Sequence, residues 1–252
     1  MSIDLAKAFD KIPKDILISK LKCFGIDSKL IDLISNILTN RKQQVKIENI
    51  LSDMLPVTSG VPQGSTLNPL LFIIFIVDLF KLDLSSKIIG FADDLKLVNF
   101  SAKNLANDLL KIAHYVNING MSINVEKCTF IHFGAKNSKY TYSLNSQIIT
   151  STSQIRDLGN LVDDDLKFSS HLDAVKMKSY RTINIIFKFF TIRNAILYKR
   201  LYKIYVLPFI LYCLPIYFTN TRGWMYGWHR KIQKYFTRRL YKLFYKDVLR
   251  PK

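Results

Sequence analysis

The sequence is short of cysteine, of long apolar runs and, over its last third, of acidic residues. Its cysteines, Cys23, Cys128 and Cys213, lie far apart and match no spacing for a metal site or a disulfide framework. No signal peptide is recognisable. We therefore expect an intracellular protein in a reducing compartment, the nucleus or the cytoplasm or both.

The longest apolar runs are too short to cross a membrane. Leu70–Val77 stops at Asp78, and Ile204–Phe218 is interrupted by Pro208 and Pro215. A membrane-spanning helix needs about 20 apolar residues. We expect no membrane partner, and we expect both runs to form buried core helices.

The shortage of acids in the last third creates a strong charge asymmetry. Residues 1–170 hold 19 lysines and arginines against 17 acids, whereas residues 171–252 hold 18 against 2. Such a basic segment on a nearly neutral body predicts a polyanionic partner such as nucleic acid. A solubilising tail or contact with an anionic membrane surface are the alternatives.

The pattern of apolar residues and turn residues predicts a mixed fold. A short strand precedes Pro13, and residues 88–98, IIGFADDLKLV, are typical of a β-hairpin. From about Phe168 onward the pattern is helical, aromatic and basic. Helices are expected at residues 13–24, 27–38, 65–80 and 101–119.

Two adjacent aspartates, Asp93 and Asp94, stand in the expected turn of that hairpin. An exposed turn explains such a pair, but apolar flanking strands increase the repulsion between the carboxylates. A divalent cation such as Mg²⁺ relieves that repulsion, and a two-metal site needs about three carboxylates. Asp4, in a short apolar strand, is the candidate for the third. Asp10 lies past this strand and is expected to brace a turn.

Five motifs occur in one order along nearly the whole chain: DLAKAFDKIP, SGVPQGSTLNPLLF, FADD, NGMSINVEKC and RDLGNLVDDDLKF. Together they resemble the reverse transcriptases of non-LTR retrotransposons, most like the jockey group. The resemblance implies an α+β fold, in which a polymerase palm with an antiparallel sheet and helices on one face is followed by a helical thumb-like region. It divides the chain into a palm at 1–153 with the fingers largely missing, a primer-grip hairpin at 154–167 and a basic helical thumb at 168–252.

The resemblance also implies roles for single residues. Asp4, Asp93 and Asp94 match the catalytic aspartates that hold two Mg²⁺ ions, with Mn²⁺ as a possible substitute, and Lys127 matches a general acid toward pyrophosphate. Phe9, Gln63 and Gly64 match the residues beside the incoming nucleotide, where Phe9 would exclude a 2′-hydroxyl. A core phenylalanine and a surface lysine are the alternatives for Phe9 and Lys127.

Further motifs imply contacts with nucleic acid. Leu158 and Gly159 match the turn of the primer grip, and basic residues of the last third are interleaved with aromatics on helical sequence. The alternative is a solvated basic face opposite an aromatic core. The residues expected to bind nucleic acid are Lys176, Lys178, Arg181, Arg230, Lys231, Arg238 and Arg239.

Some positions depart from the family pattern. Asn68 replaces a frequent glycine and Asn160 a usual apolar residue, and the finger motifs that precede Asp4 are expected to be absent.

Two hypotheses about the function follow. The chain is an RNA-directed DNA polymerase module that uses an RNA template, a DNA primer and deoxynucleoside triphosphates, or it is a catalytically inactive remnant that binds nucleic acid. The sequence carries no signal for an oligomeric state.

Overall fold

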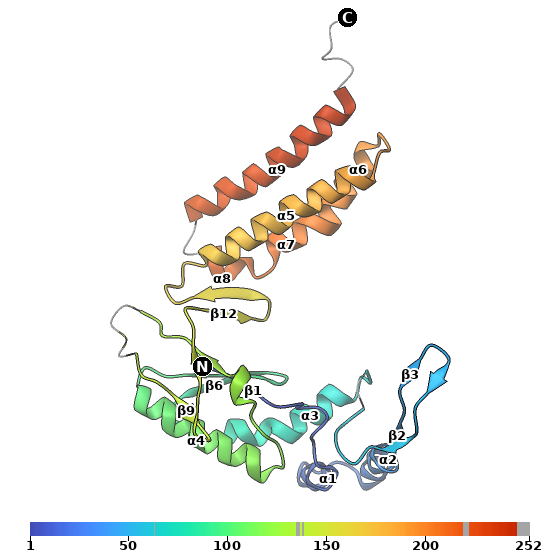
Figure 1. Cartoon of the computed structure of the whole chain (residues 1–252), viewed down its shortest axis with the longest axis vertical. Coiled ribbons are helices and arrows are strands. Elements are labelled where there is room, and N and C mark those ends of the chain that lie inside the picture. Colours follow the sequence, from blue (N-terminus) through green and yellow to red (C-terminus); the bar gives the residue numbers. More distant parts are fainter. Residues whose placement is uncertain (63, 135–136, 138, 219–221, 246–252) are drawn as a thin grey trace, which may run out of the picture. The chain divides into compact units, whose positions relative to one another are not determined.

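The computed structural model describes residues 1–62, 64–134, 137, 139–218 and 222–245. The chain forms two compact units (Figure 1). The sheet unit comprises Met1–Phe130 and Ser138–Thr152, and the helical unit comprises Ile131–Asn137 and Ser153–Lys252. The predicted mixed α+β class is confirmed, with an antiparallel-rich sheet and helices.

Five of the described strands form the main sheet, in the order β11-β8-β1-β7-β6. All neighbouring pairs are antiparallel except β11 and β8, which are parallel. The short strand β1 lies at the centre, although its neighbours come from much later in the sequence. The strands are β1 (Ser2–Asp4), β6 (Lys87–Phe91), β7 (Asp94–Val98), β8 (Thr129–Phe130) and β11 (Thr150–Ser151).

One face of this sheet is buried against helices. Ile3, Leu95 and Leu97 are buried, in one cluster with Phe72 and Leu109 of helices α3 and α4. The alternation of side chains along a strand directs Asp4, Asp94 and Lys96 to the opposite face. The helices of the sheet unit are α1 (Lys14–Cys23), α2 (Ser28–Leu38), α3 (Asn68–Ile76), η1 (Val77–Lys81), α4 (Ala102–Ile118) and η2 (Val125–Lys127).

Local sequence signals determine where several helices begin. Asp27 accepts a hydrogen bond from the Lys29 amide at the start of α2, and Ser101 accepts one from the Asn104 amide at the start of α4. The expectation of a buried core helix over Leu70–Val77 holds for one side of the helix, where Leu71, Phe72 and Phe75 are buried. Leu70 and Ile73 are about half exposed, because α3 lies on one face of the sheet and buries only one side.

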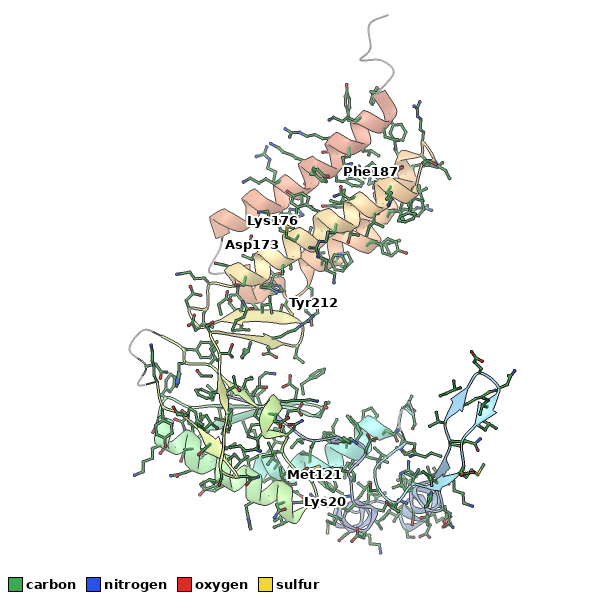
Figure 2. The ribbon with its side chains drawn as sticks, in the orientation of Figure 1. Lys20, Met121, Asp173, Lys176, Phe187 and Tyr212 are labelled. Carbon is green, nitrogen blue, oxygen red and sulfur yellow. The ribbon has the colours of Figure 1, made fainter. Side chains whose placement is uncertain are left out.

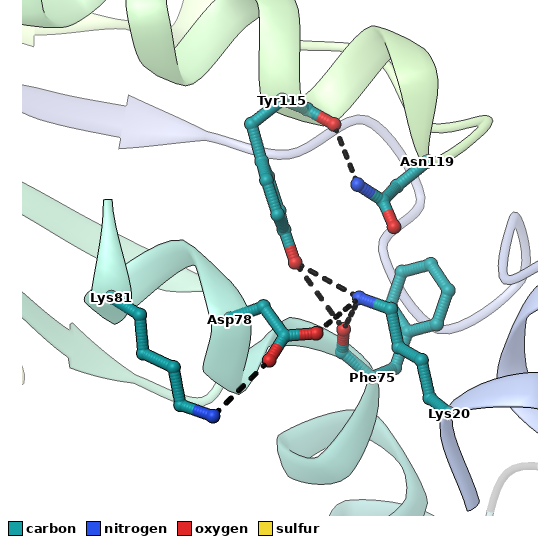
Figure 3. Close-up of polar contacts among 6 residues, drawn as sticks. All are labelled: Lys20, Phe75, Asp78, Lys81, Tyr115 and Asn119. Carbon is teal, nitrogen blue, oxygen red and sulfur yellow. Dashed lines mark hydrogen bonds and ion pairs between the residues drawn. The ribbon is translucent and has the colours of Figure 1, made fainter. Parts of the chain in front are cut away.

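A lysine with a largely covered side chain joins three helices (Figure 3). The Lys20 ammonium of α1 donates to the Phe75 carbonyl at 2.5 Å and to the Tyr115 hydroxyl at 3.0 Å. It also pairs with Asp78 of η1 at 3.2 Å. Burial raises the pKa of Tyr115, so its hydroxyl stays protonated. The network joins α1 to α3 and α4 beneath the sheet.

Three short antiparallel strand pairs complete the described part of this unit. β2 pairs with β5, and β3 pairs with β4 at the tip of an extension whose apolar side chains are largely exposed. β9 pairs with β10. These strands are β2 (Lys42–Gln43), β3 (Lys46–Ile47), β4 (Ile50–Leu51), β5 (Leu55–Pro56), β9 (Ser143–Leu144) and β10 (Gln147–Ile148).

The helical unit begins with a β-hairpin and continues as packed helices. Its core is rich in aromatics: the rings of Phe187 and Tyr198 stack at 4.8 Å, and Tyr202 lies 4.6 Å from Phe236. Helix α5 lies beside both α7 and α9 (Figure 1). The elements are β12 (Gln154–Asp157), β13 (Asn160–Asp163), α5 (Ser169–Phe189), α6 (Ala195–Leu201), η3 (Tyr202–Val206), α7 (Leu207–Leu211), α8 (Leu214–Phe218) and α9 (Arg222–Tyr245).

The second predicted core helix, Ile204–Phe218, is not one buried helix. A π-helical turn covers its start, and Cys213, with a φ of 53°, separates α7 from α8. Ile204 and Leu211 are more than half exposed. Pro208 has no amide hydrogen to continue the preceding helical bonding, which explains the change of helix type before it. Among the described residues, no helix has the length and apolarity needed to span a bilayer.

Candidate active site

Asp4 and Asp94 face each other on the open side of the sheet. The register of β1 and β7 pairs Asp4 with Asp94 and Ser2 with Lys96. Side chains at directly opposed positions have Cβ atoms about 5 Å apart. The register therefore places these two acids opposite each other on neighbouring strands.

Asp93 lies in the turn between β6 and β7, but the expectation that Asp94 lies there too is wrong, because Asp94 pairs with Phe91 as the first residue of β7. The register closes at Phe91 and Asp94, so Ala92 and Asp93 form a two-residue turn. Ala92 has a φ of 52°, in the left-handed region that tight hairpin turns require at their first central position. The turn exposes Asp93 beside the facing pair.

The donor set fits a hard divalent cation held by two carboxylates. Mg²⁺ is commonly bound by one or two carboxylates, with water and phosphate oxygens completing its shell. Within the part of the chain that the structure describes, no group of three His, Cys, Asp or Glu side chains is arranged to hold a metal ion. Asp4 and Asp94 thus form the centre of the candidate site, and Asp93 lies beside it.

Lys96 already binds one of these carboxylates. Its ammonium lies 2.8 Å from Asp94 Oδ2, and its side chain is only 16% exposed. The Ser2 hydroxyl donates to Asp94 Oδ1 at 3.5 Å. Both side chains come from positions on the open face, so Asp94 has a polar neighbour along each strand.

The backbone of Asp4 is bonded to the segment that carries Lys127. The Asp4 amide donates to Cys128 Sγ at 3.4 Å, and the Asp4 carbonyl accepts from the Asn124 amide at 2.9 Å. Burial, with the Asp4 carboxylate nearby, raises the pKa of the Cys128 thiol and keeps it neutral. Lys127 ends η2 between these contacts with an exposed side chain.

The SGVPQG segment is docked onto the turn that follows β1. The Gly60 amide donates to the Ile12 carbonyl and the Val61 amide to the Phe9 carbonyl, both at 2.9 Å. The Ser59 hydroxyl donates to the Asp10 carbonyl at 2.7 Å. Gly60 has a φ of 77°, and an added Cβ would lie 2.6 Å from the Asp10 backbone. Glycine is required here for close approach as well as for conformation.

The residues expected beside a nucleotide have distinct surroundings. The Phe9 ring lies 4.7 Å from the ring of Phe72, which fixes it against the core. Gly64 has a φ of 88° with open space where a Cβ would stand. Gln63 lies outside the described residues.

A basic cleft of about 750 Å³ lies beside the docked segment. Lys7, Arg41 and Lys42 line it together with Asp10. Arg41 donates to the carbonyl oxygens of Ser59 and Gly60, and so holds the SGVPQG segment from its other side. Sequence reasoning missed Arg41, because nothing local indicates a contact with residues 18 positions later.

In the helical unit, Leu158 and Gly159 form the turn between β12 and β13. Both have positive φ, 44° and 89°, as a two-residue hairpin turn of this kind requires. The Tyr212 hydroxyl donates to the Leu158 carbonyl at 2.6 Å (Figure 2). Tyr212, which the sequence did not single out, therefore supports this turn.

The predicted nucleic-acid-binding residues fall into two groups. Lys178 lies over the Phe209 ring at 4.0 Å, and Arg239 binds Asn184 and packs on Phe187, so both hold helices together. Lys176 pairs weakly with Asp173 at 3.9 Å on α5 (Figure 2). Lys178 is nevertheless exposed, as are Arg181, Arg230, Lys231 and Arg238.

Comparison with known proteins identifies the family. Residues 1–161 match the model of the family described as reverse transcriptase (RNA-dependent DNA polymerase). The chain belongs to the reverse transcriptase family. The predicted resemblance is confirmed, and the region matched contains Asp4, SGVPQG and FADD.

The relatives of this reverse transcriptase chain come from non-LTR retrotransposons. It is 30% identical over 195 residues to the probable RNA-directed DNA polymerase from transposon BS of Drosophila melanogaster, covering 71% of this chain and 21% of that protein. It is 26% identical over 233 residues to the RNA-directed DNA polymerase from mobile element jockey of Drosophila funebris, covering 85% and 25%. The chain thus spans about a quarter or less of the length of these relatives.

Proposed function

We propose that this chain is the palm and thumb portion of an RNA-directed DNA polymerase that extends a DNA primer on an RNA template. The placement of Asp4 opposite Asp94 on the open face of the sheet carries the proposal. In this assignment residues 1–153 are the palm, 154–167 the primer grip and 168–252 the thumb. Family membership supports the reaction class.

Asp4, Asp93 and Asp94 would hold two Mg²⁺ ions, or Mn²⁺ in their place. Bound metal supplies a lowered pKa for the primer 3′-hydroxyl and neutralises charge on the triphosphate. The carboxylates supply rigid negative charge from two paired strands, so the metal ligands need little rearrangement. Lys127 would give a proton to the departing pyrophosphate.

On the nucleotide side, Phe9 is proposed to select deoxynucleotides. Its ring packs against that of Phe72, and a ring fixed beside the sugar of the incoming nucleotide would leave no space for a 2′-hydroxyl. The docked SGVPQG segment would present Gln63 and Gly64 to the incoming nucleotide, with glycine permitting close approach of the backbone. The Leu158–Gly159 turn would grip the primer end.

Primer extension tests this function. The full chain, a DNA primer annealed to an RNA template, deoxynucleotides and Mg²⁺ should give extension that Asp94→Asn lowers by about a thousandfold or more, since a ligand carboxylate is lost. Asp32→Asn, an exposed acid on α2, is the matched control and should leave extension unchanged. Extension that survives Asp94→Asn contradicts the proposed site.

A second candidate is a catalytically inactive nucleic-acid-binding protein, which the exposed basic residues of α5 and α9 favour. It predicts binding of RNA or DNA that falls with salt and is unaffected by changing both Asp4 and Asp94 to asparagine. Such binding, with no primer extension by the wild-type chain, would favour this candidate over the polymerase.

A further inference from the structure

Lys96 is placed where its charge acts directly on the proposed metal site. It follows Asp94 by two residues on β7, so both side chains lie on the open face. In the register with β1, Asp4 pairs with Asp94 and Ser2 with Lys96. The Lys96 ammonium is therefore on the same face as both carboxylates.

The contact is a partly buried ion pair rather than a loose surface one. Nζ lies 2.8 Å from Asp94 Oδ2, the side chain of Lys96 is 16% exposed and that of Asp94 is 34% exposed. A hydrogen-bonded ion pair of this length is charge-assisted and stronger than a neutral hydrogen bond.

The Lys96 ammonium and a divalent cation would compete for the Asp94 carboxylate. Two like charges at a separation of about 5 Å repel by about 3 kcal/mol at an effective dielectric constant of 20, so facing carboxylates repel by an energy of this order and either cation relieves it. A divalent cation held by Asp94 would bring a second positive charge beside the Lys96 ammonium, and the two positive charges would repel. The presence of either cation therefore weakens the binding of the other at Asp94.

We propose that Lys96 is a built-in counter-ion of Asp94 that competes with the divalent cation and must be displaced for metal to bind. This inference rests on the metal site of the proposed function. Lys96 thereby raises the metal concentration at which the site fills, and it stabilises the carboxylates when no metal is bound. The role assigned to Lys96 is regulation of metal affinity, not chemistry on the substrate.

Mn²⁺ binding to the full chain tests the proposal, with free Mn²⁺ measured by electron paramagnetic resonance. Lys96→Met keeps the length of the side chain and removes its charge, so it should tighten Mn²⁺ binding by about tenfold or more. Lys96→Arg keeps the charge and should bind Mn²⁺ as the wild type does. Unchanged or weaker binding by Lys96→Met overturns the proposal.

Lys87 provides a matched control on the same face of the same sheet. It pairs with Val98, which is four residues beyond Asp94 on β7. This spacing is about 13 Å, beyond the screening length at physiological salt. Lys87→Met removes an equal charge and should leave Mn²⁺ affinity unchanged within about twofold. An equal tightening in both variants would show a general charge effect and overturn the proposal.

Chemical labelling of the wild-type chain keeps the test valid even where Lys96→Met fails to fold. Acetylation of each lysine, measured by mass spectrometry, should rise severalfold at Lys96 when saturating Mg²⁺ is added, and should stay constant at Lys87. Unchanged labelling of Lys96 at a Mg²⁺ concentration that saturates the site contradicts displacement.

Asp4→Asn and Asp94→Asn separate this inference from the proposed function. Where both variants lose Mn²⁺ binding but Lys96→Met does not tighten it, the metal site stands and the competition fails. Where Mn²⁺ binding persists in both aspartate variants, the metal site itself fails, and with it the counter-ion role of Lys96.

Discussion

At the scale of single residues, two asparagines are buried at the cost of an unpaired polar atom. Asn160 is 5% exposed, and its Oδ1 has no hydrogen-bond partner among the described residues. Asn68 is also buried, and its Nδ2 likewise has no partner among them. At both positions the family resemblance predicts another residue, a glycine at 68 and an apolar residue at 160. Such departures lower stability without touching the candidate site, since a buried unpaired polar group carries a desolvation cost.

Asn160→Leu, which has nearly the same shape, should raise the free energy of unfolding of the helical unit by about 1 kcal/mol. Both tryptophans lie in this unit, so their fluorescence during denaturant unfolding measures the change. Asn194→Leu is the control: Asn194 Oδ1 accepts from the Ile196 and Leu197 amides, and its loss should cost about 1 kcal/mol. A destabilised Asn160→Leu chain would refute this account.

At the scale of elements, the Lys20 network should matter far more than its exposed neighbour. The Lys20 side chain is 14% exposed and bonds to groups of α3, η1 and α4. The Lys81 side chain is 69% exposed, and its ammonium lies 3.6 Å from the same Asp78 carboxylate. Lys20→Met should destabilise the sheet unit by about 2 kcal/mol, because Asp78 and the Phe75 carbonyl lose a buried partner.

Lys81→Met should change stability by less than about 0.5 kcal/mol, as expected for a surface pair. Hydrogen exchange of peptides from α3 and α4, followed by mass spectrometry, measures both variants. Equal effects of the two substitutions would show that burial of Lys20 contributes nothing.

The contact between α5 and β13 should make the stability of the helical unit depend on pH. The Leu161 amide donates to His171 Nδ1 at 3.3 Å, and burial lowers the pKa of this imidazole below its usual 6.5. The unfolded chain then binds more protons near pH 6 than the folded one does. The stability of the helical unit should therefore fall as pH drops below about 6.5.

Tryptophan-monitored unfolding between pH 8 and 5 measures this slope. His171→Gln should flatten it, and His114→Gln, a change of an exposed histidine in the sheet unit, should keep it. A wild-type chain whose helical unit is equally stable at both pH values would contradict the assignment.

At the scale of the whole molecule, the charge excess of residues 171–252 should make nucleic-acid binding steeply salt-dependent. Of two adjacent arginines on α9, we expect one to affect nucleic-acid binding and the other to affect folding stability. Arg238 is exposed, whereas Arg239 binds Asn184 and packs on Phe187. Arg238→Gln should weaken binding of an RNA–DNA duplex and reduce the slope of log affinity against log salt by about 0.9.

Arg239→Gln should instead lower the stability of the helical unit, because a contact between α9 and α5 is lost. Fluorescence anisotropy of a labelled duplex and tryptophan-monitored unfolding measure the two effects. Loss of stability in Arg238→Gln, with binding unchanged, would reverse the assignment.

The sequence predicted the elements whose signals are local and missed contacts between distant segments. The hairpin around Asp93 and the helices expected at 27–38 and 101–119 follow from short-range chemistry, whereas the Leu158–Gly159 turn was implied by the family resemblance. The position of Lys96 could also have been predicted from the sequence, since its two-residue spacing from Asp94 on a strand places both side chains on one face. The contacts of Arg41 and Tyr212 could not have been predicted, because their partners lie 18 and 54 residues away in the sequence and no periodic pattern connects them.

The roles of the site residues and the palm, primer-grip and thumb boundaries stay predictions. Geometry alone does not assign chemistry to Phe9, Lys127 or the Leu158–Gly159 turn. Primer extension and Mn²⁺ binding are the measurements that would assign it.

The central position of β1 has a consequence for the order of folding. The β6–β7 hairpin joins neighbours in sequence, but β1 must insert between β7 and β8, which begin about 90 and 125 residues later. Contacts of such high sequence separation close slowly, because the loop entropy is lost before they form. Asp4 therefore reaches Asp94 late, and recovery of Mn²⁺ binding during refolding should lag behind helix formation.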